Sequence, residues 1–359
     1  MWPQSTVADV IHVDWSGGGD YTTIWEGIRA AAAGDTVVVA SGTYTHQHCL
    51  RLETNIVLRS ETGQPDCVTW DGGNSTKILA CFNLGPGSLI EGITFSHGYE
   101  DNYWSHAGAV FCYECSLRIR HCVFRDNTAA RDGGALVIEG SAVVEDCVFI
   151  GNTAGSTGGA LCLWEATARN CIFLENEAND GAAAVSCDIW DGCSAEGCTF
   201  VGNVGPYVFG AFAGVRISNC TFLDNRVSET SGCVSVCYGP LTIDNSIIAG
   251  TEGGAALDCL YGTGATLRCC DIFGNAGGDW TGCVSDQLGS DGNIAADPLF
   301  CGTANPDLPW SLHDASPCTP ENSPCGQLIG SCGVGCPSTA AEGVSWGSLK
   351  ARYRDRASP

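Results

Sequence analysis

The stretch HCVFRDNTAARDGGAL, from His121 to Leu136, returns from Asp146 to Leu161 as DCVFIGNTAGSTGGAL. Both contain a cysteine, a phenylalanine, an asparagine and Gly-Gly-Ala in the same order. The phrase Cys-x-aromatic-x-x-Asn occurs in five copies, whose cysteines are spaced by 25, 24, 27 and 22 residues. This period is too short for a helical repeat or a propeller blade, and it predicts one solenoid turn of three short strands.

In such a solenoid, equivalent side chains of successive turns stack about 4.8 Å apart. We expect an inward ladder of thiols and a second ladder of amides, at a corner where asparagine tolerates a left-handed backbone. The ladders consist of Cys122, Cys147, Cys171, Cys198 and Cys220, and of Asn127, Asn152, Asn176, Asn203 and Asn225. A metal ladder is the alternative, but each cysteine lies in an apolar strand without a second ligand nearby. We therefore predict reduced, buried and metal-free thiols.

These phrases resemble the right-handed parallel β-helix proteins of the pectate-lyase-like superfamily, in particular secreted bacterial ones. The resemblance covers roughly residues 10 to 300. It implies an all-β fold, a right-handed parallel β-helix (solenoid) with three short strands per coil. The stretch SGGGDYTTIWEGIRAAAAGDTVVVASGTYT looks like the opening of such chains. It predicts an N-terminal capping helix with Thr22 or Thr23 as N-cap, Ile24 and Ile28 on its apolar face and a stop at Gly34.

The chain divides into four parts. These are an N-terminal strand and capping helix (1–35), the coils (36–295), a terminal cap rich in Cys, Pro and Gly (296–340) and a basic tail (341–359). The terminal cap is expected to be irregular and cross-linked, because its composition breaks the repeat. Short-range disulfides are predicted outside the ladder: Cys112 with Cys115, Cys187 with Cys193, and Cys233 with Cys237. The pairing of the eight cysteines between Cys269 and Cys336 stays open.

Composition and charge narrow the function. The 359 residues include 40 acidic and 16 basic side chains, a net charge of −24, which disfavours nucleic acid and anionic membrane surfaces as partners. No run approaches the roughly 18 apolar residues of a membrane span. The 24 cysteines indicate an extracellular or cell-surface protein, and the opening residues lack the regions of a signal peptide, so we expect a secreted protein whose signal is not present in this chain.

Because the resemblance includes enzymes, the sequence must be examined for their catalytic residues. Pectate lyases use a calcium ion held by carboxylates and a nearby arginine or lysine as base. The corresponding residues here are arginines beside Asp126 and Asp132, and we interpret them as surface ion pairs: Arg118, Arg120, Arg125 and Arg131. The Gly-His-Gly turn of the polygalacturonase-like subgroup is absent. We leave the question of an enzyme open and favour no catalytic residues and no cofactor, although the negative charge would tolerate loosely bound calcium.

The histidines His46 and His48 are predicted to point to one face of a strand and could bind a transition metal. Since no carboxylate accompanies them, we expect no metal site.

The longest rung, from Ile93 to Cys122, is the best ligand-binding candidate. Its extra length carries aromatic and acidic side chains suited to sugar rings and hydroxyls: His97, Tyr99, Glu100, Asp101, Tyr103, Trp104 and His106. Long insertions protrude from one side of a solenoid, where binding is common. The alternative is that these aromatics only pack the loop onto the stack.

The final ten residues carry a net charge of +3 and leave −27 on the rest of the chain. We expect them to form an assembly contact or a secretion or anchoring tail, through Trp346, Lys350, Arg352, Tyr353, Arg354 and Arg356. The favoured function is a non-catalytic extracellular solenoid with a structural or adhesive role, which binds extracellular polysaccharide or assembles head-to-tail with itself into filaments. The alternative is a secreted polysaccharide-acting enzyme, either a lyase or a glycoside hydrolase.

Overall fold

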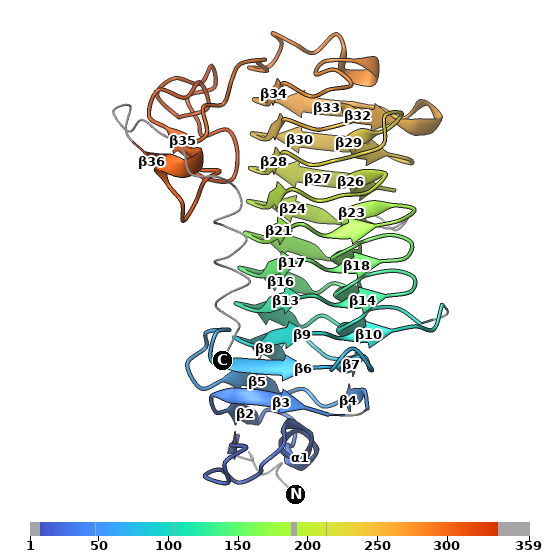
Figure 1. Cartoon of the computed structure of the whole chain (residues 1–359), viewed down its shortest axis with the longest axis vertical. Helices are drawn as coiled ribbons and strands as arrows, with labels where there is room; N and C mark the ends of the chain where they lie inside the picture. The colour runs from blue at the N-terminus through green and yellow to red at the C-terminus, as the bar shows by residue number, and fades with distance from the viewer. Residues whose placement is uncertain (1–7, 47, 104, 188–191, 213, 337–359) are drawn as a thin grey trace, which may run out of the picture.

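The chain is a right-handed parallel β-helix, as the repeat predicts (Figure 1). The structure is a computed structural model that describes residues 8–46, 48–103, 105–187, 192–212 and 214–336. Each coil contributes one strand to each of three long parallel sheets, which we call A, B and C in the order in which a coil visits them.

Sheet A contains β1 (Val10–Val13), β2 (Thr36–Val39), β5 (Val57–Ser60), β8 (Leu89–Glu91), β12 (Arg118–Arg120), β16 (Val143–Glu145), β20 (Thr167–Arg169), β24 (Ser194–Glu196), β27 (Val215–Ser218), β30 (Leu241–Asp244) and β33 (Ala265–Arg268). Sheet B contains β3 (Gly42–Thr45), β6 (Val68–Asp71), β9 (Thr94–Ser96), β13 (Val123–Arg125), β17 (Val148–Ile150), β21 (Ile172–Leu174), β25 (Thr199–Val201), β28 (Thr221–Leu223), β31 (Ile247–Ala249) and β34 (Asp271–Phe273).

Sheet C contains β4 (Leu50–Leu52), β7 (Leu79–Phe82), β11 (Val110–Tyr113), β15 (Leu136–Glu139), β19 (Leu161–Trp164), β23 (Ala182–Cys187), β26 (Tyr207–Ala211), β29 (Gly232–Val236) and β32 (Ala255–Cys259). A short fourth sheet, D, lies between B and C along the chain and contains β10 (Tyr99–Glu100), β14 (Thr128–Ala129), β18 (Thr153–Ala154) and β22 (Glu177–Ala178). The remaining elements are β35 (Leu312–His313), β36 (Val334–Cys336) and three short 3-10 helices, η1 (Leu260–Gly262), η2 (Gly282–Val284) and η3 (Gly302–Ala304).

The N-terminal end is covered by α1 (Ile24–Ala30), as predicted. The Thr23 hydroxyl accepts a hydrogen bond from the backbone N–H of Glu26, and Ile24 and Ile28 are buried on the core side. The helix ends four residues before Gly34, because Ala31 is already extended. Gly34 instead belongs to the turn that leads into β2, where its φ of 95° suits glycine.

Stacked aromatic rings cover the core-facing side of sheet B. Successive phenylalanines from Phe124 to Phe222 lie nearly parallel, with ring centroids 4.3 to 4.9 Å apart. The ladder thiols are 0 or 1% exposed and none of them is bridged. Burial raises the pKa of Cys147 and of Cys220 well above the ordinary value, so these side chains stay thiols.

The asparagine column is a continuous hydrogen-bonded ladder. Asn127 Nδ2 donates to Asn152 Oδ1 (2.9 Å), and the same contact repeats up to Asn225 at 2.9 to 3.0 Å. The expectation of a left-handed backbone at the asparagines is wrong: the left-handed residue precedes each one, for example Asp126 (φ 54°) and Gly151 (φ 62°). The side-chain amide of each asparagine is fixed by the ladder hydrogen bonds, and the preceding residue adopts the left-handed conformation of the turn.

The predicted Cys-rich cap is irregular and cross-linked, but most of it covers a side of the solenoid. Trp280 and Val284 pack against the end of the core, whereas the following chain folds back beside sheet B (Figure 1). There Trp310 is 1% exposed and packs with the outward side chains Ile150, Leu174 and Val201. Leu312, Cys318 and Ile329 pack in the same way on Ile247 and Ala249.

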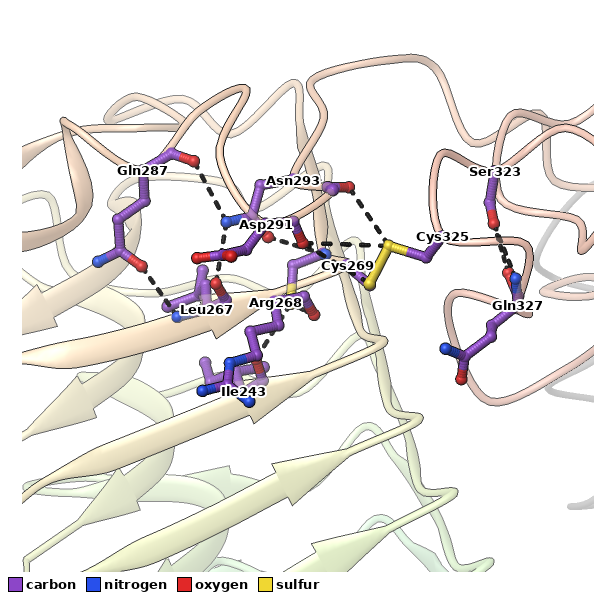
Figure 2. Close-up of a disulfide and its surroundings, with 12 residues drawn as sticks. Ile243, Leu267, Arg268, Cys269, Gln287, Asp291, Asn293, Ser323, Cys325 and Gln327 are labelled. Carbon is purple, nitrogen blue, oxygen red and sulfur yellow. Dashed lines mark hydrogen bonds between the residues drawn. A yellow bond between two sulfur atoms is a disulfide. The ribbon is translucent and has the colours of Figure 1, made fainter.

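Three disulfides lie in this C-terminal region: Cys259–Cys283, Cys269–Cys325 and Cys301–Cys336. The second ties the last coil to the folded-back segment (Figure 2). Two of the three short-range pairs predicted from spacing are wrong, since Cys112, Cys115, Cys233 and Cys237 are free thiols.

Geometry explains why Cys233 and Cys237 stay free. Cys233 lies on β29 and Cys237 directly follows its end, so four extended residues, about 13 Å, separate them, which exceeds the reach of a disulfide. Cys115 and Cys193 instead donate their thiol hydrogens to backbone carbonyls, those of Tyr113 and Leu163.

Candidate functional site

The predicted loop begins as regular structure. Tyr99 and Glu100 form β10, which pairs in parallel with β14 and opens sheet D. Beyond it Tyr103 is 57% exposed, and Arg131 lies over its ring with Cζ 5.6 Å from the centroid. Trp104 lies outside the described residues. The rung is therefore a coil with a short protruding tip rather than a free insertion (Figure 1).

The two histidines anchor the ends of this rung. His97 Nδ1 lies 3.0 Å from Asp71 Oδ2 on the preceding coil. His106 Nδ1 lies 3.1 Å from Asp132 Oδ2, and its ring stacks on Phe111 with centroids 6.1 Å apart. Both histidines are thereby fixed to neighbouring side chains.

Three of the predicted residues, Tyr99, Glu100 and Asp101, line an open pocket of about 340 Å³ beside β10. Ala80, Phe82 and Phe111, the outward residues of β7 and β11, also line it. The pocket combines apolar and aromatic side chains with a polar wall, which is the usual composition of a small-molecule site.

Lys77 holds the polar wall of this pocket together. It is 8% exposed, its Nζ lies 3.2 Å from Glu100 Oε2, and it donates to Ser105 Oγ at 2.8 Å. Burial pushes the pKa of Glu100 upward. Hydrogen bonds from Ser105 and Asn102 and the charge of Lys77 outweigh that effect, so the pKa lies below its ordinary value. Glu100 is therefore a fixed carboxylate acceptor at neutral pH.

The sequence did contain a signal for Lys77, because the chain has only two lysines and the other lies in the tail. The aromatic lining residues could not be found in this way. Phe82 and Phe111 belong to sheet C strands on two coils, and only the stacking of the coils brings them beside β10.

Two of the four arginines considered as catalytic bases, Arg118 and Arg120, belong to ion pairs on the outer face of sheet A. One column of this sheet alternates in sign from coil to coil: Arg59, Glu91, Arg120, Glu145, Arg169 and Glu196. Arg120 lies 2.7 Å from Glu91, Arg169 lies 3.1 Å from Glu196, and Arg118 pairs with Glu145. Arg131 pairs with Asp132 at 3.1 Å. No ion pair of the described residues joins Arg125 to Asp126.

Near the last coils, sheet A and the folded-back segment enclose a polar groove of about 540 Å³. Glu196, Arg216, Asp244 and Arg268 line it from consecutive coils, and Gln327 lines it from the segment. Arg216 and Asp244 form an ion pair at 2.8 Å, whereas Arg268 has no ion-pair partner in the described part of the chain. Figure 2 shows Arg268 next to the Cys269–Cys325 disulfide, with Gln327 on the segment beyond it.

The predicted common strand face of His46 and His48 is not formed, because both residues lie between β3 and β4. His46 follows the end of β3, and both of its ring nitrogens are used: Nδ1 accepts from Trp70 Nε1 (2.7 Å) and Nε2 faces the carbonyl of Ile78 (3.2 Å). Burial lowers the pKa of His46, in agreement with a neutral ring. Within the described ranges, no group of three or more histidine, cysteine or acidic side chains could hold a metal ion.

Fold and surface together define a parallel β-helix repeat protein with an open pocket on its side. A model of the Chlamydia polymorphic membrane protein repeat matches residues 146–163, which contain one copy of the ladder phrase. The pectin methylesterase from Aspergillus niger is similar in structure, at 14% sequence identity, with 82% of this chain and 91% of that chain covered and a TM-score of 0.38. Comparison with curated proteins gives no match. Among the described residues, no helix has the length and hydropathy of a membrane span.

Proposed function

We propose that this protein is a non-catalytic, surface-displayed or secreted β-solenoid with an adhesive role. The observation that carries the proposal is the open pocket beside β10, on the side of the stacked coils. The match to a repeat of a polymorphic membrane protein supports a location at the cell surface. The abundance of acidic side chains supports a partner without phosphate groups.

The proposed ligand is a glycan of the extracellular environment. A sugar ring presents C–H groups on its faces and hydroxyls around its edge. The apolar side chains of Phe82, Phe111 and Tyr99 suit the faces, and the fixed Glu100 carboxylate suits the hydroxyls.

A glycan array with matched variants tests this proposal. Tyr99→Ala and Asp101→Asn alter the exposed rim of the pocket without removing a buried ion pair, and Tyr238→Ala, an exposed aromatic far along the stack, is the control. We expect the first two to lose retention and the control to keep it. Trp104→Ala is also expected to abolish retention with an almost unchanged melting temperature. A wild-type protein that binds no glycan would overturn the proposal.

The groove at Glu196, Arg216, Asp244 and Arg268 favours a second candidate function, a polysaccharide-acting enzyme. Arginine and carboxylates from consecutive coils converge there, and Arg268 is unpaired within the described residues. An assay on polygalacturonate, with and without calcium, tests this candidate. Product formation that Arg268→Ala abolishes would establish an enzyme, and its absence under both conditions would leave the adhesive role.

The assembly residues, from Trp346 to Arg356, lie outside the described residues, as do the rest of the tail and the last residues assigned to the terminal cap. Head-to-tail assembly through this basic segment therefore remains a proposal that rests on charge, +3 against −27. Deletion of residues 347–359 should leave a folded monomer, and high salt should weaken assembly of the full-length chain. A full-length protein that stays monomeric at low salt and high concentration would contradict it.

A further inference from the structure

A second and larger hollow lies at the N-terminal end of the stack, between α1 and the first coils. It has a volume of about 560 Å³, and two exposed indole rings, Trp15 and Trp25, line it together with Leu50 of β4. Trp15 is 61% and Trp25 is 45% exposed. Both rings are far more exposed than Trp70 and Trp310, which are 1% exposed.

The local structure holds the Trp15 ring in place. Its Nε1–H donates to the Ser41 carbonyl at 3.1 Å. The ring lies against Gly42 at the start of β3, where an added Cβ would come within 2.4 Å of Nε1. A side chain at position 42 would push the ring away, so this glycine permits the close approach. Trp15 is thus a preorganised flat surface rather than a free side chain.

Unused hydroxyl groups surround the rings. The outward side chains of Thr43 and Thr45 on β3 line the hollow and are exposed, and neither hydroxyl forms a hydrogen bond with the described residues. No acidic residue, lysine or arginine is among the described residues of the lining, but the Arg29 guanidinium lies over one face of the Trp25 ring, with Cζ 4.6 Å from the centroid, so a ligand would stack on the other face. Flat aromatic surfaces and free hydroxyls, with no carboxylate, ammonium or guanidinium group in the lining itself, suit an uncharged polyhydroxylated ligand better than an anionic or cationic one.

This hollow and the pocket beside β10 share a lining residue. Cys49, the residue before β4, lines both of them. Because β4 is the edge strand of sheet C, no further strand of that sheet separates the two spaces at this end. The surface therefore offers two binding areas in line, an uncharged aromatic one and one with the Lys77–Glu100 pair.

We propose that the two hollows form one extended groove that binds a neutral oligosaccharide chain, with sugar rings stacked on Trp15 and Trp25 and the chain continuing past Cys49 into the pocket beside β10. The inference rests on the proposed glycan-binding function and adds the ligand class and the direction of the chain. It distinguishes a ligand of several sugar units from a single sugar residue.

Calorimetric titration with neutral β-1,4-linked oligosaccharides of glucose and of N-acetylglucosamine tests the proposal, with disaccharide and hexasaccharide compared in each series. We expect at least one hexasaccharide to bind about tenfold more tightly than its disaccharide, since one additional stacked ring is worth roughly that factor. Trp15→Ala and Trp25→Ala should each reduce hexasaccharide affinity and leave disaccharide affinity unchanged. Trp25 lies on the exposed surface of α1, so Trp25→Ala is not expected to disturb the fold. It therefore still tests the proposal if Trp15→Ala unfolds the N-terminal end. Tyr261→Ala, a 77% exposed aromatic near the other end of the stack, is the matched control.

Equal affinity for the two lengths, unaffected by either tryptophan variant, would overturn the extended groove and leave the pocket beside β10 standing. Binding of neither length would overturn the proposed function together with this inference. The groove could instead be occupied by a second copy of the chain or by the chain's own N-terminal residues. Each of these occupants predicts a different result, and either result would overturn the inference. Concentration-dependent dimers that Trp25→Ala abolishes would identify a second copy of the chain. Oligosaccharide binding that appears only after deletion of residues 1–7 would identify the chain's own N-terminal residues.

Discussion

The central coils and the folded-back C-terminal segment reach stability by different means. From Cys122 to Asn225 the interior is a set of identical side chains in register, with unbridged thiols, parallel rings and a continuous amide ladder. The segment from 296 to 336 has almost no repeated contacts and carries one end of one disulfide and both ends of another. Periodicity lets one local arrangement satisfy every coil, whereas a unique segment needs cross-links to offset its chain entropy.

The largest expected effect comes from breaking the ring stack in the centre. Phe149→Ala removes a fully buried ring that stacks on Phe124 and Phe173 at 4.8 and 4.9 Å, and we expect it to cost about 4 kcal/mol of unfolding free energy. Chemical denaturation measures the change. Phe273→Ala at the last strand, where the ring is 37% exposed, is the control and should cost far less. Equal losses would mean that the stack contributes nothing beyond ordinary burial.

The second-largest loss of unfolding free energy is expected when the asparagine ladder is broken. Asn176→Ala removes the donor to Phe149 O (3.1 Å) and to Asn203 Oδ1 (3.0 Å), and it also removes the acceptor for Asn152. We expect a loss of about 3 kcal/mol, because the partners remain buried without hydrogen bonds. Thermal or chemical unfolding of Asn179→Ala, an exposed asparagine three residues away, provides the reference. An unaffected Asn176→Ala protein would show that the ladder is a consequence of stacking and not a support for it.

Reduction of the disulfides should affect the C-terminal segment and the central coils differently. The disulfides identified in the described residues all lie between Cys259 and Cys336, and each is worth about 2 to 4 kcal/mol. A reducing agent should therefore increase hydrogen exchange in 296–336 and leave the amides of the central coils protected. Mass-spectrometric hydrogen exchange provides the measurement. Equal acceleration in both regions would show that the segment supports the whole stack.

The contact between the last coil and the segment should depend on pH. Asp271 of β34 is fully buried and accepts hydrogen bonds from Cys318 Sγ (3.1 Å) and the Ala296 N–H (3.0 Å). Burial raises the pKa of Asp271 to about 6, with smaller upward contributions from Asp279 and Asp297. Since the folded pKa lies above the unfolded one, the protonated group stabilises the fold at pH below about 4, and this contribution is lost as the pH rises through 6.

We expect this pH dependence to amount to roughly 1 to 2 kcal/mol between pH 4 and 7. Melting temperatures across that range measure it, and Asp271→Asn should flatten the profile. A variant that keeps the wild-type slope would assign the titration to another group.

The repeat predicted the solenoid and its two inner ladders, because these features depend on residues at a constant offset along the chain. The N-terminal helix was predicted separately, from its N-cap threonine and the spacing of Ile24 and Ile28. Cys122 and Cys147 are neighbours in space since one turn separates them in sequence, and the same offset aligns Asn127 with Asn152. Such contacts need no knowledge of distant segments.

Contacts without a period were decided only by the tertiary structure. Nothing local shows that Trp310 packs on Ile150, that Cys269 pairs with Cys325, or that Phe111 belongs to the pocket beside Tyr99. Two of the disulfides predicted from closeness in sequence were wrong for the same reason: the direction in which a strand carries its thiols matters more than the number of residues between them. A repeated offset determines which side chains stack, and packing between non-repeated segments determines where the surface is covered and where it stays open.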